Sequence, residues 1–110
     1  MKKDIFNALA VVITDLYELK DEESGETTLF NKTRKTHITE PRQVLIYLCS
    51  DYKMKNVTII KYLNEKGLNF QSSDIVRSKT ALEGKIEEDR DYERLFDRLR
   101  QKVNHIINNQ

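Results

Sequence analysis

The chain has 110 residues, a formal net charge of +1 at pH 7, 38% hydrophobic residues and 34% charged residues. This length predicts one domain with a modest hydrophobic core. Three glycines and one proline are too few for many short strands joined by tight turns, so we expect an all-α fold. The single cysteine, Cys49, excludes an internal disulfide and favours a reducing compartment, so we expect a cytoplasmic protein.

The first predicted element is an amphipathic helix over residues 3–20, followed by an acidic tail that ends at Ser24 and Gly25. Its apolar stretch is short and interrupted by polar residues, which predicts neither a signal peptide nor a membrane anchor. We expect the aliphatic side of this helix to enter the core. The alternative is a surface for a partner or for a second copy in a homodimer. That side consists of Ile5, Leu9, Val12 and Leu16, with Phe6 and Val11 beside it.

A short turn, a basic loop and an apolar helix are expected next, within "FNKTRKTHITEPRQVLIYL" and just before it. The turn over 26–31 would bury Leu29 and Phe30, and residues 32–40 show no hydrophobic period. Pro41 favours the first turn of a helix, where the missing N–H costs nothing, with Thr39 or Glu40 as the cap. The residues that follow are apolar nearly all round and predict a buried central helix. They are Val44, Leu45, Tyr47, Leu48 and Tyr52.

The third helix is expected over residues 57–66, with Val57, Ile60 and Leu63 facing inward and Gly67 ending it. A connector over 68–71 follows.

Two more helices complete the predicted domain. Ser72 or Ser73 would cap a helix that continues through Ile86, and the last helix would start near Asp89 and reach Ile106. The two helices over about 57–87 have the order of a helix-turn-helix. The expectation is therefore a single all-α domain of five to six helices.

Positive charge is concentrated in residues 32–42, where the one acid is Glu40. Lys and Arg bind phosphate by charge and by releasing condensed counterions, and Arg can enter a narrow minor groove. We predict that this segment contacts duplex DNA; the alternative is a solvated loop that offsets the acidic residues 21–26. Arg42 would reach a phosphate or, alternatively, pair with Glu40 or an acid of the last helix. The candidate contacts are Lys32, Arg34, Lys35, His37 and Arg42.

The start of the fourth helix is the second candidate surface. Its polar residues lie near a helix N-terminus, which favours phosphate, and Gln, Ser and Arg can read base edges. Asp74 would oppose phosphate but can accept a bond from cytosine. An ordinary capped helix with a solvated face is the alternative. The candidate residues are Gln71, Ser72, Ser73, Arg77, Ser78 and Lys79.

The segment over 29–48 resembles the C-terminal DNA-binding domain of the bacterial replication initiator DnaA, which is related in shape to the Trp repressor. The resemblance extends more weakly through Val57 and Ile60 to the last helix. It implies a helix-turn-helix in the major groove, Arg34 in the minor groove, and Lys32 and Arg42 on the DNA-facing side. The residues that carry it are Leu29, Phe30, Lys32, Arg34, Lys35, Ile38, Pro41, Arg42, Gln43, Val44, Tyr47 and Leu48.

Residues 71–75 depart from the family pattern Asp-His-Thr/Ser-Thr-Val, since only Ser73 and Ile75 match it. Because of this departure, the resemblance does not imply recognition of the family's usual box sequence. The ATPase module that precedes the domain in the family is not part of these 110 residues, so we do not expect a complete initiator.

The remaining chemistry-bearing residues do not form a pattern typical of an enzyme. His37 and His105 are far apart in sequence, and Cys49 lies among apolar residues, so we expect a buried structural cysteine, no catalytic residue and no metal or cofactor. The sequence therefore predicts a non-enzymatic duplex-DNA-binding protein with no membrane or small-molecule substrate. A role in replication or its regulation is what the resemblance implies. The alternatives are a protein-interaction module of the same fold and a transcriptional regulator of a mobile element.

Overall fold

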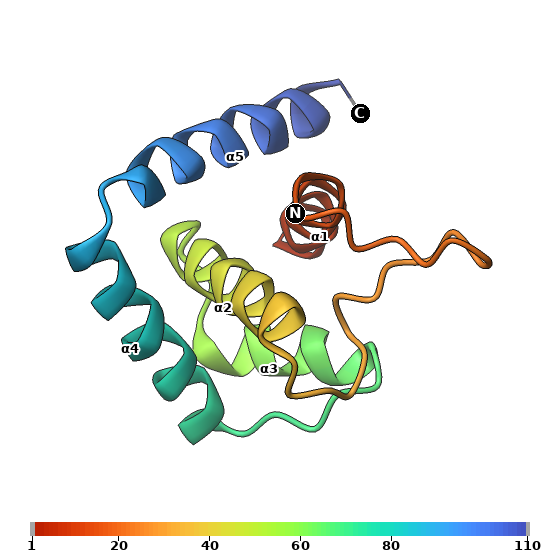
Figure 1. The fold of residues 1–110 in the computed structure, drawn as a ribbon, viewed down its shortest axis with the longest axis horizontal. Coiled ribbons are helices and arrows are strands. Elements are labelled where there is room, and N and C mark those ends of the chain that lie inside the picture. The colour runs from red at the N-terminus through yellow and green to blue at the C-terminus, as the bar shows by residue number, and fades with distance from the viewer. Residues whose placement is uncertain (1, 110) are drawn as a thin grey trace.

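The computed structural model describes residues 2–109, which form five helices and no strand (Figure 1). The all-α prediction is confirmed. None of the helices within this part of the chain is long and apolar enough to cross a membrane. The helices are α1 (Lys2–Leu16), α2 (Thr36–Asp51), α3 (Asn56–Glu65), α4 (Ser72–Glu88) and α5 (Asp91–Asn108).

Helix α2 lies at the centre of the domain and the other helices pack around it (Figure 1). Val44, Leu45 and Leu48 are fully buried, as expected for an apolar central helix. Helix α1 packs against both α2 and α5, and Leu9 and Val12 lie in the core. The prediction that the aliphatic side of the first helix enters the core is therefore confirmed.

Helix α2 begins earlier than predicted, because its first residue is Thr36 and not a residue near Pro41. The carbonyl of Lys35 accepts the N–H groups of Ile38 and Thr39, and Ile38 is buried against the core. Pro41 therefore lies in the second turn, where it deprives the His37 carbonyl of its helical partner. His37 is exposed, so water can satisfy that carbonyl. The loop before α2 is therefore shorter than predicted, because it ends at Lys35.

Helix α1 ends at Leu16, short of the predicted Lys20. Glu18 has a left-handed backbone with φ 55°, and the chain reverses there to bury Leu19. A single antiparallel bridge then joins Lys20 to Thr27. The acidic residues within 21–26, predicted as a tail of the helix, instead form the tip of the loop between Lys20 and Thr27.

Helix α3 faces the core partly as predicted, because Leu63 is buried and Ile60 is half-buried and packed against the core. Val57 is 69% exposed, which contradicts its expected inward position, while Ile59 and Leu63 are fully buried. Gly67 ends the helix as predicted, with a φ of +99°.

Two helix starts also differ from the prediction. The residue that caps α4 is Gln71 and not Ser72 or Ser73. Helix α5 starts at Asp91, two positions after the expected Asp89. Boundary shifts of this size reflect local capping, which hydrophobic periodicity does not specify.

Candidate nucleic-acid interface

An open cleft of about 510 Å³ separates the loop before α2 from the connector between α3 and α4. We call it the basic cleft. Lys32 and Arg34 line it from the loop, Asn69 and Phe70 from the connector, and Asp74 from the first turn of α4. The structure thus brings together two segments that are separated by more than one helix in the sequence.

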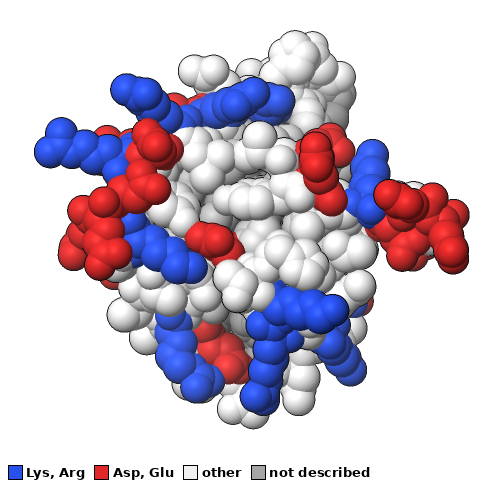
Figure 2. Space-filling model, viewed as in Figure 1, with Lys and Arg blue, Asp and Glu red and all other residues white. Residues whose placement is uncertain are grey.

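The charges of the molecule are divided between different parts of its surface (Figure 2). On the face shown, one group of Lys and Arg side chains lies in the lower part, over the loop before α2 and the first turns of α4, and a second group lies at the upper left over α5. Acidic side chains gather at the right over the loop after α1 and at the left near the junction of α4 and α5. A near-zero total is therefore compatible with a local positive surface.

The loop itself presents its cations to solvent. Lys32, Arg34 and Lys35 are exposed, and His37 is exposed in the first turn of α2. The N–H of Lys35 donates to the hydroxyl oxygen of Thr33 at 3.2 Å, which holds the end of the loop in a local turn. These four predicted contact residues therefore have side chains free to approach a ligand.

Arg42 occupies a different environment from the other predicted cations, because it is 6% exposed. Its Nε and Nη2 donate to the carbonyl oxygen of Leu29 at 3.0 and 2.9 Å, and Nη2 also donates to the carbonyl of Asn31 at 2.6 Å. Burial lowers the pKa of Arg42. Its hydrogen-bond partners are thus backbone carbonyls and neither of the acids considered above, and its guanidinium fixes the segment that leads into the basic loop.

Asn64 fixes the other wall of the cleft, through the backbone of Phe70. Its Oδ1 accepts the Phe70 N–H at 2.8 Å, and its Nδ2 donates to the Phe70 carbonyl at 3.2 Å. Both backbone groups of a connector residue are therefore satisfied by one side chain of α3. Sequence reasoning missed this residue; a polar side chain directly after the buried Leu63 was the available signal.

Asp74 organises the first turn of α4. One carboxylate oxygen accepts the N–H of Gln71 at 2.8 Å, and the other accepts a bond from Arg77 Nη2 at 2.6 Å. Its negative charge is therefore compensated within the protein. Ser72 and Ser73 are exposed beside it, and the Arg77 side chain is 74% exposed.

The last two predicted residues of α4 lie deeper. Ser78 and Lys79 are half-buried, and Lys79 Nζ donates to Oδ1 of Asn56 at 2.6 Å. Lys79 therefore joins α4 to the start of α3 rather than extending freely into solvent.

Cys49 is fully buried in α2, and burial raises its pKa to about 12. The expectation that Cys49 is buried is confirmed. Among residues 2–109, no group of three or more His, Cys, Asp or Glu side chains is arranged to hold a metal ion.

Comparison with protein-family models, with curated proteins and with solved structures gives no match to this chain. The resemblance noted from the sequence remains a prediction, and the geometry of the basic cleft is the basis for assigning a function.

Proposed function

We propose that the chain is a non-enzymatic protein that binds duplex DNA through the basic cleft. The observation that carries this proposal is that exposed Lys32 and Arg34 line the same open cleft as the connector and first turn of α4. Cationic loops bind the phosphate backbone, and the polar start of a helix can approach base edges in the major groove.

In the proposed complex the loop and the helix have separate tasks. Lys32 and Lys35 contact phosphates, and Arg34 enters the minor groove, as the resemblance implies. Helices α3 and α4 act as a helix-turn-helix, with Gln71 to Ser73 and Arg77 directed to the major groove. Because phosphate contacts position a protein and base contacts specify a sequence, the loop supplies most of the affinity.

Arg42 and Lys79 take supporting roles in this proposal, although both were candidate contacts. Their side chains already bond the Leu29 carbonyl and the Asn56 side chain. In this proposal Arg42 positions the basic loop, and Lys79 positions α4 against α3. A role in replication or its regulation follows from the resemblance alone.

A protein-interaction module is the second candidate function. Val57 on α3 and Val76 on α4 are 69% and 54% exposed, on the two helices that would otherwise form the DNA-reading unit. A contact with another protein requires a contiguous exposed apolar patch, and these two valines would be its aliphatic members. The absence of the family's aspartate-histidine pair at 71–75 agrees with this alternative.

An NMR titration of the ¹⁵N-labelled protein with a duplex DNA pool distinguishes the two. DNA binding through the basic cleft predicts amide shift changes confined to residues 31–37 and 69–77. Absence of changes at low salt would contradict the proposal and favour the interaction module, whereas changes located on α1 and α5 would contradict it by showing that DNA binds another surface.

A further inference from the structure

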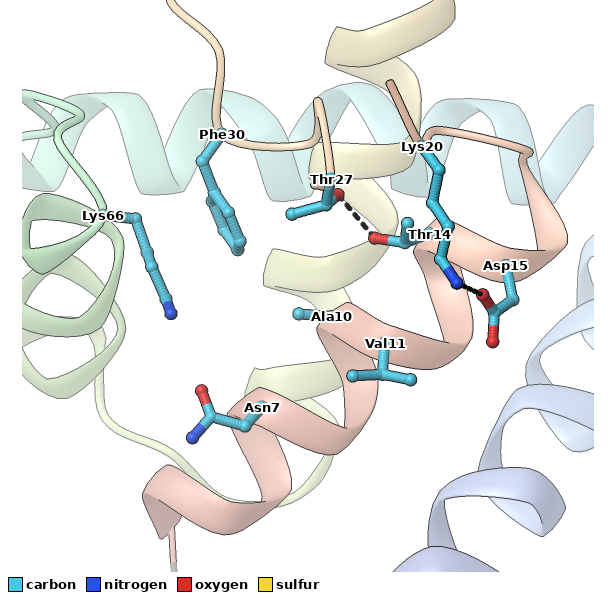
Figure 3. A pocket seen from close by; sticks show the side chains of 9 residues that line it. All are labelled: Asn7, Ala10, Val11, Thr14, Asp15, Lys20, Thr27, Phe30 and Lys66. Atoms are coloured by element: carbon cyan, nitrogen blue, oxygen red, sulfur yellow. Dashed lines mark hydrogen bonds and ion pairs between the residues drawn. The ribbon is translucent and has the colours of Figure 1, made fainter. Parts of the chain in front are cut away.

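A second cavity, of about 420 Å³, lies between α1 and the loop after it (Figure 3), and it shares no lining residue with the basic cleft. Helix α1 provides its floor with Asn7, Ala10, Val11 and Thr14, and the loop residues Thr27 and Phe30 cover the opposite side. This volume is within the range of small-molecule sites, roughly 300 to 1,000 Å³.

The apolar part of the cavity wall consists of Ala10, Val11 and Phe30, and contacts within the protein hold it in place. Phe30 stacks on Phe6 with ring centroids 5.9 Å apart, so the loop carries a fixed aromatic surface. The hydroxyl groups of Thr14 and Thr27 lie 2.6 Å apart in a hydrogen bond that joins the loop to α1. Val11, 54% exposed, adds an aliphatic surface beside Ala10.

The two ends of the cavity differ in charge. At one end Lys20 Nζ lies 3.5 Å from an Asp15 carboxylate oxygen, so that end is electrically neutral. At the other end Lys66 extends toward the cavity from just beyond α3, facing the side of Asn7 (Figure 3).

Lys66 has no carboxylate within ion-pair distance among the described residues, 2–109; its ammonium group lies 5.7 Å from the centroid of Phe30. The neighbouring Glu65 pairs with Lys3 at 2.9 Å. One end of the cavity therefore carries an ammonium group that is outside ion-pair distance of any carboxylate of residues 2–109 and lies next to the Asn7 amide; the Glu65 carboxylate acts on it at longer range.

We propose that this cavity binds a small amphipathic carboxylate, with its apolar body between Phe30 and Val11 and its carboxylate at Lys66. A single ammonium and one amide suit a monoanion, whereas a phosphate group requires more donors. The aromatic and aliphatic walls suit a phenyl or short alkyl body.

A titration of the ¹⁵N-labelled protein with 3-phenylpropanoate, in the absence of DNA, tests the site. The neutral analogue 3-phenylpropanamide is the matched probe. We expect amide shift changes at Ala10, Thr14 and Phe30. The acid should bind about tenfold more tightly than the amide, which corresponds to ~1.4 kcal/mol.

Two pairs of variants isolate the charge. Lys66→Met removes the preference for the acid, while Lys61→Met, an exposed lysine of α3 that does not line the cavity, retains it. Val11→Glu weakens acid binding relative to the isosteric Val11→Gln, because the added carboxylate repels the ligand.

Several outcomes would overturn the proposal. They are absence of shift changes with the acid, equal affinity for acid and amide, and an equal loss in Lys66→Met and Lys61→Met. Because no DNA is present, failure here leaves the proposed DNA-binding function to its own test.

Discussion

The guanidinium of Arg42 bonds the carbonyl oxygen of Leu29 through two nitrogens, Nε and Nη2, at 3.0 and 2.9 Å. Leu29 is itself fully buried, so this contact ties the end of the turn to the central helix. The basic loop starts only a few residues later. Arg42, which was a candidate phosphate contact, therefore has a structural role.

Replacing Arg42 by methionine should lower the free energy of unfolding by ~1–3 kcal/mol, because the carbonyl of Leu29 loses its partner inside the protein. Denaturant unfolding measures this change. DNA affinity should fall as well, with an unchanged salt dependence, because no phosphate contact is lost. Arg98→Met, at an exposed position of α5, is the control and should alter stability by less than about 0.5 kcal/mol. A stable Arg42→Met with a smaller salt slope would instead show that Arg42 contacts phosphate.

Replacing Asn64 by leucine tests the two hydrogen bonds between its side chain and the backbone of Phe70. Both backbone groups of Phe70 lose their partner, so we expect a loss of ~1–3 kcal/mol in stability. The Phe70 amide should also exchange its hydrogen with solvent much faster than in the wild type. Asn64→Asp retains the acceptor and should preserve protection of this amide better. Unchanged exchange in Asn64→Leu would contradict the assigned role.

Alkaline pH should destabilise the protein through Cys49. Burial raises the pKa of the thiol from 9.0 to about 12, so the folded state holds the proton more tightly than the unfolded state. Its contribution to stability is complete below about pH 9 and decreases as the pH rises toward 12. Cys49→Ala should show a shallower loss of stability over this range in denaturant titrations.

Tyr17 acts in the same direction, since burial raises its pKa from 10.0 to about 12, so part of the alkaline loss should remain in Cys49→Ala. The native thiol should also resist a thiol-specific reagent that labels the denatured chain at once. Equal labelling rates for native and denatured protein would show that Cys49 is accessible.

Arg77→Ala tests base reading by α4. A duplex sequence selected from a random pool should lose ~1–3 kcal/mol of binding free energy, while random DNA loses less. Fluorescence anisotropy with both duplexes measures the difference. Equal losses on the two duplexes would mean that Arg77 contacts only the backbone or acts through Asp74.

Hydrophobic periodicity predicted the number of helices and the buried central helix, because the apolar residues around Val44 and Leu45 leave no solvated side. It failed where the packing of a single residue decides the structure. The start of α2 at Thr36 depends on the burial of one isolated residue, Ile38, within a polar segment. The exposure of Val57 depends on how α3 packs against α4, which a short helix with apolar residues on two sides does not reveal.

The sequence predicted the exposed cations of the candidate site but not the residues that hold its two walls in place, Arg42 and Asn64. Exposed Lys32, Arg34 and Lys35 agree with a basic loop, because charged side chains avoid burial. The burial of Arg42 depends on unpaired carbonyls that only the fold brings near it. The role of Asn64 likewise depends on the position of the connector beside α3, which the sequence pattern does not specify.

The salt dependence of DNA affinity tests the central claim most directly. It is measured with one duplex pool for the wild type, for the double variant Lys32→Ala/Arg34→Ala and for Arg94→Ala/Arg98→Ala, which removes the same charge from exposed positions of α5. The basic cleft predicts that the wild-type affinity falls steeply with salt, and that the slope decreases by roughly 1 to 2 in the loop variant only. No binding at low salt, or equal slope changes in the two double variants, would contradict it.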